Sequence, residues 1–126
     1  MTKRVLDVGN CSMDHGSIRG LLERQFRAEV VQAYGPDDAL KLLRQGKFDL
    51  VLVNRKLDAD YSDGLEIIKS IKADVQMAAV PCMLITNYSE HQDAAIAAGA
   101  ERGFGKKELQ TAETQQRLAA ILTLDP

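Results

Sequence analysis

The sequence predicts an α/β fold, a doubly wound parallel sheet of five strands in a single domain. Short apolar segments alternate with longer segments whose apolar residues recur at the three- and four-residue spacing of one helix face. This alternation is typical of βαβ units with right-handed crossovers. The length of 126 residues corresponds to one ordinary domain, so we expect residues 1–126 to form a single unit.

The first half of the chain contains three predicted strands, at residues 5–8, 29–33 and 50–53. The third has the clearest pattern, because four consecutive apolar residues suit a strand buried on both faces. The helix after the first strand has an apolar face of Ile18, Leu21, Leu22 and Phe26. A second helix begins after Gly35, with a proline and two aspartates in its first turn, and ends at Gly46.

The second half continues the alternation after a polar loop at residues 54–63. Asp63 is the predicted cap of a third helix, and Ser89 with Gln92 forms the capping box expected of a fourth helix that ends at Gly99. Two further strands are predicted at residues 80–85 and 102–105. A last helix carries Leu118, Ile121 and Leu122 on one face.

Composition excludes several classes of protein. The net charge of −2 lacks the basic excess of a nucleic-acid-binding surface, and no apolar run is long enough for a membrane span. Charged and polar residues interrupt the N-terminus where a signal peptide would be apolar. Cys11 and Cys82 have no metal-ligand spacing and are expected to be free thiols. We therefore expect a cytoplasmic protein without direct contact to nucleic acid or membrane.

Sites in parallel α/β sheets lie beyond the carboxyl ends of the strands, where the chain changes direction across the sheet. The residues that directly follow the predicted strands are therefore the candidates for function. They are Gly9, Asn10, Asn54, Arg55, Thr86 and Lys106.

Four segments together resemble the receiver domain of bacterial two-component response regulators, the CheY-like member of the flavodoxin-like folds. These segments are Phe48 to Asn54, Asp63-Gly64-Leu65-Glu66, Val80-Pro81 through Ile85-Thr86, and Ala98-Gly99-Ala100 before Lys106. The resemblance covers nearly the whole chain and implies the strand order 2-1-3-4-5. Nothing that resembles an output domain follows Leu124, so a receiver-like domain alone is expected in this chain.

The resemblance also implies which positions form the phosphorylation site. Receivers carry two acidic residues that hold Mg²⁺, a phosphoacceptor aspartate, a serine or threonine, and a lysine. The corresponding positions here are Gly9 and Asn10, Asn54, Thr86 and Lys106, so only the last two match. The aromatic switch residue of the family aligns with Gly103, and Lys107 replaces the proline after the lysine.

These replacements predict a degenerate receiver without catalytic residues. An asparagine cannot form an acyl phosphate, and Mg²⁺ prefers carboxylate oxygens, so we expect Mg²⁺ binding to be lost and no cofactor to be used. The predicted function is phosphorylation-independent binding of a protein such as a sensor kinase, an output protein or another signalling protein. A homodimer through the fourth helix, fifth strand and fifth helix is also compatible with the resemblance.

Two alternatives remain open. The first is a working phosphorelay receiver that uses one of the loop carboxylates Asp58, Asp60 or Asp63. The second is a flavodoxin-like binder of an anion or nucleotide, suggested by Lys106 with Arg55 and Lys56 nearby. The absence of a glycine-rich phosphate loop after the first strand argues against the second alternative.

Three further residues carry expectations about their surroundings. Asp7 falls inside a strand covered on both faces, so its carboxyl group needs a partner, for which we expect Lys106 or another cation. His15 and His91 are isolated at helix starts and have no ligand spacing, so both are predicted to lie at the surface.

Overall fold

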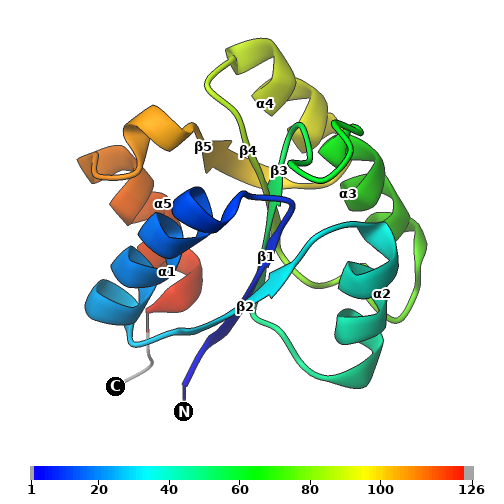
Figure 1. Ribbon diagram of the computed structural model, residues 1–126, viewed down its shortest axis with the longest axis horizontal. Helices are drawn as coiled ribbons and strands as arrows, with labels where there is room; N and C mark the ends of the chain where they lie inside the picture. Colours follow the sequence, from blue (N-terminus) through cyan, green and yellow to red (C-terminus); the bar gives the residue numbers. More distant parts are fainter. Residues whose placement is uncertain (1, 124–126) are drawn as a thin grey trace.

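Strands and helices alternate along residues 2–123, the part of the chain that the computed structural model describes (Figure 1). The strands are β1 (Arg4–Val8), β2 (Glu29–Ala33), β3 (Leu50–Asn54), β4 (Cys82–Ile85) and β5 (Glu101–Phe104). The helices are α1 (Ser12–Phe26), α2 (Pro36–Gln45), α3 (Gly64–Ala73), α4 (Ser89–Ala97) and α5 (Ala112–Leu122), with a short 3-10 helix, η1, at Lys106–Glu108. Leu124, after which the sequence predicts no output domain, lies outside the described residues.

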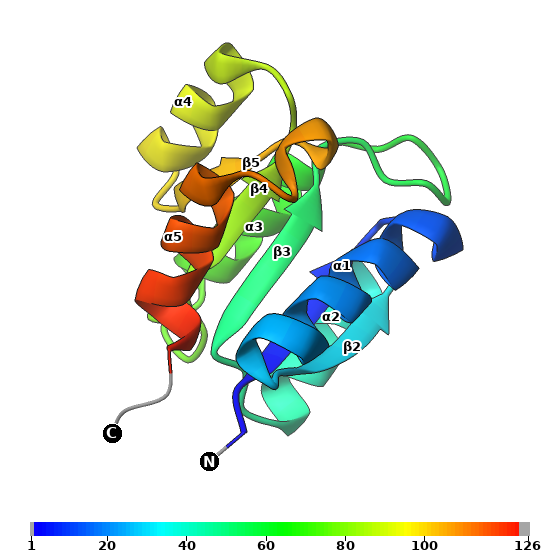
Figure 2. The same cartoon turned by 90° about the vertical axis from the view of Figure 1, so that its left-hand side faces the viewer.

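The strands form one parallel sheet in the order β2-β1-β3-β4-β5, which confirms the fold class and the strand order (Figure 2). β1 pairs with both β2 and β3, so the chain changes direction across the sheet after β2. Val8 pairs with Val53, and the residues that follow β1 and β3 therefore lie next to each other. This is the switch point at which such sheets form their sites.

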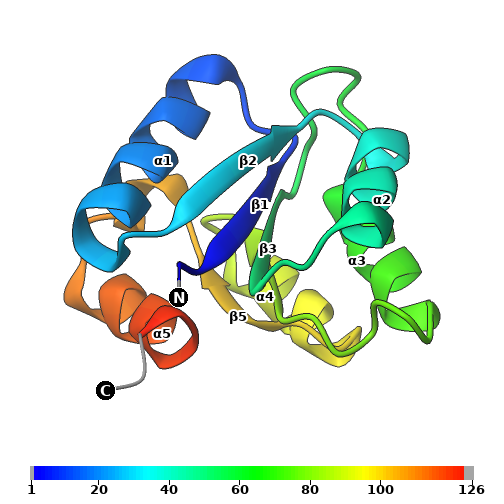
Figure 3. The same ribbon diagram turned by 90° about the horizontal axis from the view of Figure 1, so that it is seen from below.

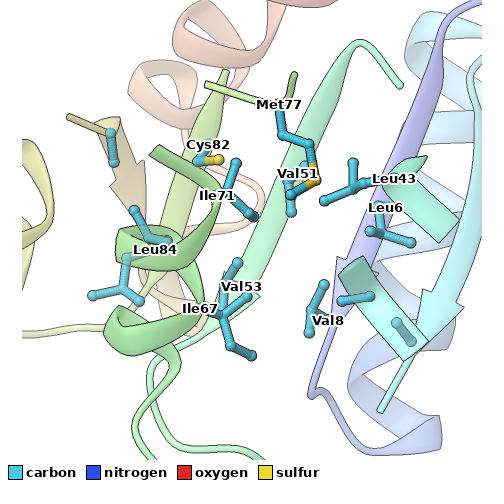
Figure 4. Packing of buried hydrophobic residues seen from close by; sticks show 14 of the residues in the cluster. Leu6, Val8, Leu43, Val51, Val53, Ile67, Ile71, Met77, Cys82 and Leu84 are labelled. Atoms are coloured by element: carbon cyan, nitrogen blue, oxygen red, sulfur yellow. The ribbon is translucent and has the colours of Figure 1, made fainter. Parts of the chain in front are cut away.

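Helices cover both faces of the sheet, α1 and α5 on one face and α2, α3 and α4 on the other (Figures 1 and 3). Alternate strand residues supply the two cores. Leu6 and Val8 belong to the cluster with α2 and α3, where Figure 4 shows Val53 close to Ile67. Val5 belongs to the cluster with α1 and α5. By the same alternation Asp7 points toward α1, which matters for its partners.

The predicted strand ends near β4 and β5 differ from the structure. β4 begins at Cys82 rather than at residue 80, because Pro81 has no N–H to donate to the sheet. β5 begins one residue earlier than predicted and contains an irregularity: Met83 pairs with Glu101 whereas Ile85 pairs with Phe104, which leaves one extra residue on β5. The helix η1 has no counterpart among the predicted elements.

The helix caps confirm one prediction and contradict another. Asp63 caps α3, since its carboxylate accepts from the N–H of Leu65 at 3.0 Å. The prediction of a capping box formed by Ser89 and Gln92 is wrong, because the N-cap residue of α4 is Tyr88, whose side chain makes no capping hydrogen bond. Gln92 is instead only 4% exposed, because its amide is hydrogen-bonded to the sheet.

The helices of the domain are short, the longest being the 15 residues of α1. Among the described residues, no helix combines the length and the apolar character that crossing a bilayer requires.

Candidate functional site

The residues singled out from the sequence lie beyond the carboxyl ends of the strands, but they do not form one group. Asn54, Thr86 and Lys106 line a cavity of about 240 Å³ at the ends of β3, β4 and β5. Gly9 and Asn10 follow β1 and do not line that cavity. The positions that match the family pattern are thus divided into a cavity and a closed corner beside it.

Gly9 is the first residue after β1, and its φ angle of 82° lies in the left-handed region that favours glycine. A β-carbon at this position would lie 2.2 Å from Cδ2 of Leu57. Leu57 is only 1% exposed, and the N–H of Asp58 donates to the carbonyl oxygen of Gly9 at 2.9 Å. The Leu57 side chain therefore fills the space that a side chain at Gly9 would need.

Asn54 ends β3 and connects it to the loop that follows. Its Nδ2 donates to the carbonyl oxygen of Lys56 at 2.8 Å and to that of Gly9 at 3.2 Å. These carbonyls are hard oxygen atoms of the kind that a divalent cation uses, and here an amide nitrogen holds them. Figure 2 shows this loop, in green, reaching beyond the ends of the strands.

Asp7 is fully buried in β1 and has two side-chain partners. Asn10 Nδ2 donates to its Oδ1 at 2.5 Å, and His15 Nδ1 lies 2.7 Å from its Oδ2. Burial raises the pKa of Asp7, although the hydrogen bonds from His15 and Asn10, and the positive charges of His15 and Lys106, oppose this. The carboxyl group is thus held inside a closed polar cluster.

This cluster bears on two predictions. The sequence predicts Lys106 or another cation as the partner of Asp7, and the basic side chain that contacts the carboxylate is His15 of α1 rather than Lys106. The prediction of a surface position for His15 is wrong, because its side chain is only 12% exposed. Asp7 points toward α1, and the first turns of that helix bring the ring to it. His91 is also partly buried, with its ring 3.4 Å from the Thr86 hydroxyl.

Asn10 is 1% exposed and has one unusual atom. Its Oδ1 is buried and has no hydrogen-bond partner among the described residues. The backbone oxygen of the same residue accepts from Gln32 Nε2 at 3.3 Å. Asn10 is therefore joined to β1 through its side-chain nitrogen and to β2 through its backbone oxygen.

Lys106 makes an ion pair with Asp14, with 2.7 Å between Nζ and Oδ2. The hydrogen bond from Lys106 lowers the pKa of Asp14, helped by the Cys11 thiol, which donates to the same carboxylate oxygen at 3.3 Å. Cys11 also caps α1 by accepting from the N–H of Asp14. The lysine at the expected position thus has a carboxylate partner, but one on α1.

Thr86 and two basic residues complete the cavity wall. The Thr86 hydroxyl oxygen accepts from the N–H of Tyr88 at 3.3 Å. Arg55 and Lys56 also line the cavity, and neither makes an ion pair within residues 2–123. Lys56 lies 5.8 Å above the ring of Tyr61. The wall is therefore positively charged.

Gly103 of β5 is the residue that the sequence aligns with the family's switch aromatic. A β-carbon there would lie 2.2 Å from the carbonyl oxygen of Leu84. Gln92 of α4 joins the two strands at this point: its Nε2 donates to Leu84 O at 2.9 Å and to Thr86 O at 3.4 Å, and its Oε1 accepts from the N–H of Gly103 at 2.8 Å. The irregularity in β5 is thereby fixed to β4 and α4.

The loop carboxylates Asp58, Asp60 and Asp63 are all exposed. Asp60 accepts from the hydroxyl and the N–H of Ser62, which lowers the pKa of Asp60. Asp63 is the helix cap described above. None of the three lines the cavity with Thr86 and Lys106.

The sequence profile of the response regulator receiver domain matches residues 13–119, most of the chain. The chain belongs to this family. It is therefore a receiver domain of two-component signalling, a signalling module rather than a classical enzyme.

Solved receiver domains have the same fold. The signal receiver domain of a DNA-binding response regulator from Colwellia psychrerythraea is 26% identical, with a TM-score of 0.75 and coverage of 90% of this chain and 94% of that one. A response regulator from Burkholderia pseudomallei, whose structure contains a phosphorylated aspartic acid, is 27% identical, with a TM-score of 0.71 and coverage of 96% and 67%. One from Chloroflexus aurantiacus, 19% identical, has a TM-score of 0.81 and coverage of 98% and 100%, which shows the fold alone.

Three residues of this receiver domain were missed at the sequence level. Leu57 could have been noticed as the one aliphatic side chain larger than alanine in the polar loop after β3. Asp14 lies three residues after Cys11 in the first turn of α1, where a carboxylate is commonplace. Gln92 was interpreted as part of a capping box, and nothing in the neighbouring sequence indicates that its side chain binds β4 and β5.

Proposed function

We propose that this receiver domain acts without phosphorylation, as a module that binds a protein partner. The observation that carries the proposal is the corner at Gly9, where Leu57 occupies the space of the first acidic side chain. The same corner holds the asparagine that replaces the phosphoacceptor. Restoring Mg²⁺-dependent phosphorylation would thus require a new conformation of the loop after β3 as well as acidic residues at positions 9, 10 and 54.

The donor chemistry of the corner does not fit Mg²⁺. Asn54 presents an amide nitrogen to the carbonyl oxygens of Gly9 and Lys56, so a donor stands where a cation would need to be. The nearby carboxyl group of Asp7 is fully buried and already bonded to Asn10 and His15. Within residues 2–123, no three histidine, cysteine or acidic side chains are grouped to hold a metal ion.

A fixed conformation of the β4–α4–β5 region supports the same proposal. Phosphorylation signals require two alternative arrangements of a segment, whereas Gln92 ties α4 to both strands through three buried hydrogen bonds. Gly103 supplies no aromatic side chain that could change its rotamer. The binding surface formed by α4, β5 and α5 would therefore keep one shape, and Ile96 of α4 is 42% exposed there.

The decisive experiment is intact mass spectrometry of the chain after incubation with Mg²⁺ and a small phosphodonor such as acetyl phosphate. We expect no added phosphoryl group. The Burkholderia relative, whose structure contains a phosphorylated aspartic acid, is the positive control.

Two results would overturn the proposal. A stable adduct that Asn54→Ala removes would show that the acceptor region still works. An adduct mapped to Asp58, Asp60 or Asp63 would favour a relay receiver with a displaced acceptor. The geometry argues against the second result, because in-line phosphoryl transfer needs a carboxylate held beside Lys106 and Thr86, and these three are exposed on the loop.

A further inference from the structure

The cavity beyond β3, β4 and β5 has an unusual charge distribution. Arg55, Lys56 and Lys106 all line it, and none of the residues around it is acidic. Two of these cations make no ion pair among the described residues. Within residues 2–123, Lys106 pairs with the carboxylate of Asp14, which lines a neighbouring cavity of about 230 Å³. An anion in the first cavity would therefore lie among three basic side chains and no acidic one.

A hydrogen-bond donor for such an anion is also present. The Thr86 hydroxyl oxygen accepts from the N–H of Tyr88 and lies 3.4 Å from Nδ1 of His91, so a bound oxyanion would compete with that ring nitrogen for the hydroxyl proton. Thr86 is 8% exposed, so its position is fixed by the packing of β4. The combination of a fixed hydroxyl with an ammonium and a guanidinium group matches a planar oxyanion.

The size of the cavity limits its ligand. Its volume of about 240 Å³ is below the roughly 300 to 1,000 Å³ of pockets that enclose drug-sized ligands, so a nucleotide would not fit inside. A carboxylate side chain would fit. The rim consists of Asn87 and of Tyr88, which is 61% exposed, and tyrosine with arginine is typical of the energetic centre of protein interfaces.

We propose that this cavity receives the carboxylate of an aspartate or glutamate side chain of the protein partner, held without a covalent bond by Lys106, Arg55 and Thr86. The inference rests on the proposed function and names the chemistry by which the module recognises its partner. Asp14 is an internal competitor for the same lysine. A bound carboxylate would draw Lys106 away from Asp14 and connect the cavity to the start of α1.

The test is an NMR titration of the ¹⁵N-labelled chain with a short blocked peptide that contains one glutamate. The same peptide with glutamine and inorganic phosphate serve as separate probes, at constant ionic strength and without divalent metal or phosphodonor. We expect the glutamate peptide alone of the two peptides to shift the amide signals of Thr86, Asn87 and Lys106, with a dissociation constant on the order of 10 mM.

Three variants sharpen the result. Lys106→Gln should weaken binding about tenfold, since it removes one charge-assisted hydrogen bond. Lys107→Gln is the matched control, because the adjacent lysine does not line this cavity, and it should leave the affinity unchanged. Asp14→Asn should strengthen binding because it frees Lys106.

Several outcomes would overturn the inference. Equal losses with Lys106→Gln and Lys107→Gln would mean non-specific attraction, and no shift at the cavity would mean no site. Shifts with phosphate but not with the glutamate peptide would indicate a site for a free inorganic ion. Because no phosphodonor is present, each of these results leaves the mass-spectrometric test of the proposed function unaffected.

Discussion

Cδ2 of Leu57 lies 2.2 Å from the point that a β-carbon on Gly9 would occupy, so the two positions depend on each other. A side chain at Gly9 would require Leu57 to shift from its present position. The loop after β3 is thus packed against the residue that follows β1 through an apolar contact.

Gly9→Asp should destabilise the fold. The substitution forces a β-carbon into Leu57 and places a non-glycine residue at a φ angle of 82°. Overpacking and backbone strain together should lower the free energy of unfolding by about 2 to 5 kcal/mol. Urea unfolding followed by circular dichroism measures this.

Gly16→Ala is the control for Gly9→Asp. Nothing lies within 4 Å of a β-carbon at Gly16, which is exposed on α1. Alanine should stabilise this helix by about 0.5 to 1 kcal/mol. If Gly9→Asp unfolded at the wild-type urea concentration, the contact with Leu57 would be looser than the structure indicates.

Asn54→Asp alone should not restore phosphorylation. The introduced carboxylate would face the carbonyl oxygens of Gly9 and Lys56 and could donate to neither, while Leu57 would still pack against Gly9. We expect a loss of about 1 to 3 kcal/mol in the free energy of unfolding at neutral pH. Intact mass after Mg²⁺ and acetyl phosphate should show no adduct; an adduct would mean that Leu57 can move aside.

The sequence predicted the sheet well because the signals for it are local. The four consecutive apolar residues from Leu50 to Val53 suit a strand with both faces covered, and they are the first four residues of β3. The predicted ends of β4 and β5 differ from those in the structure by one or two residues. The reason is the pairing between strands: Pro81 has no N–H to donate, and β5 has one extra residue opposite β4.

The site was less predictable because its contacts are between distant segments. Asn54, Thr86 and Lys106 were found from their places after strands and from the family resemblance, and they line one cavity. The pairing of Lys106 with Asp14 depends on how α1 lies against η1, which no pattern within either segment encodes. Leu57 can pack at this place only because Gly9, which is distant in sequence, has no side chain.

Gln92→Leu should loosen the connection between α4 and the sheet. The change removes the donor to Leu84 O and Thr86 O and leaves the N–H of Gly103 buried without its acceptor. We expect a loss of about 2 to 4 kcal/mol in the free energy of unfolding, together with faster hydrogen exchange at the Gly103 amide. Gln116→Leu, on the exposed side of α5, should change stability by less than about 0.5 kcal/mol.

Unchanged exchange at Gly103 in Gln92→Leu would contradict a fixed α4. In that case the region could adopt the alternative arrangements that a phosphorylation signal uses, and the argument for a constant binding surface would fail.

The stability of the domain should depend on pH through Asp7. Burial raises its pKa above the usual 3.8, so the folded state keeps a proton that the unfolded chain has already released. The stabilising contribution of Asp7 is therefore complete below the unfolded pKa and is lost as the pH rises through the folded pKa. Asp7→Asn has no proton to lose, and its amide oxygen can still accept from Asn10.

Urea unfolding of both proteins over a series of pH values tests this sign. The stability of wild type relative to Asp7→Asn should fall as the pH increases from about 3.8, and the carboxyl carbon of Asp7 should titrate above that value by ¹³C NMR. Asp60→Asn is the control of opposite sign, because hydrogen bonds from Ser62 lower the pKa of that exposed carboxyl. A carboxyl signal of Asp7 that titrated below 3.8 would mean that the ion pair with His15 outweighs burial.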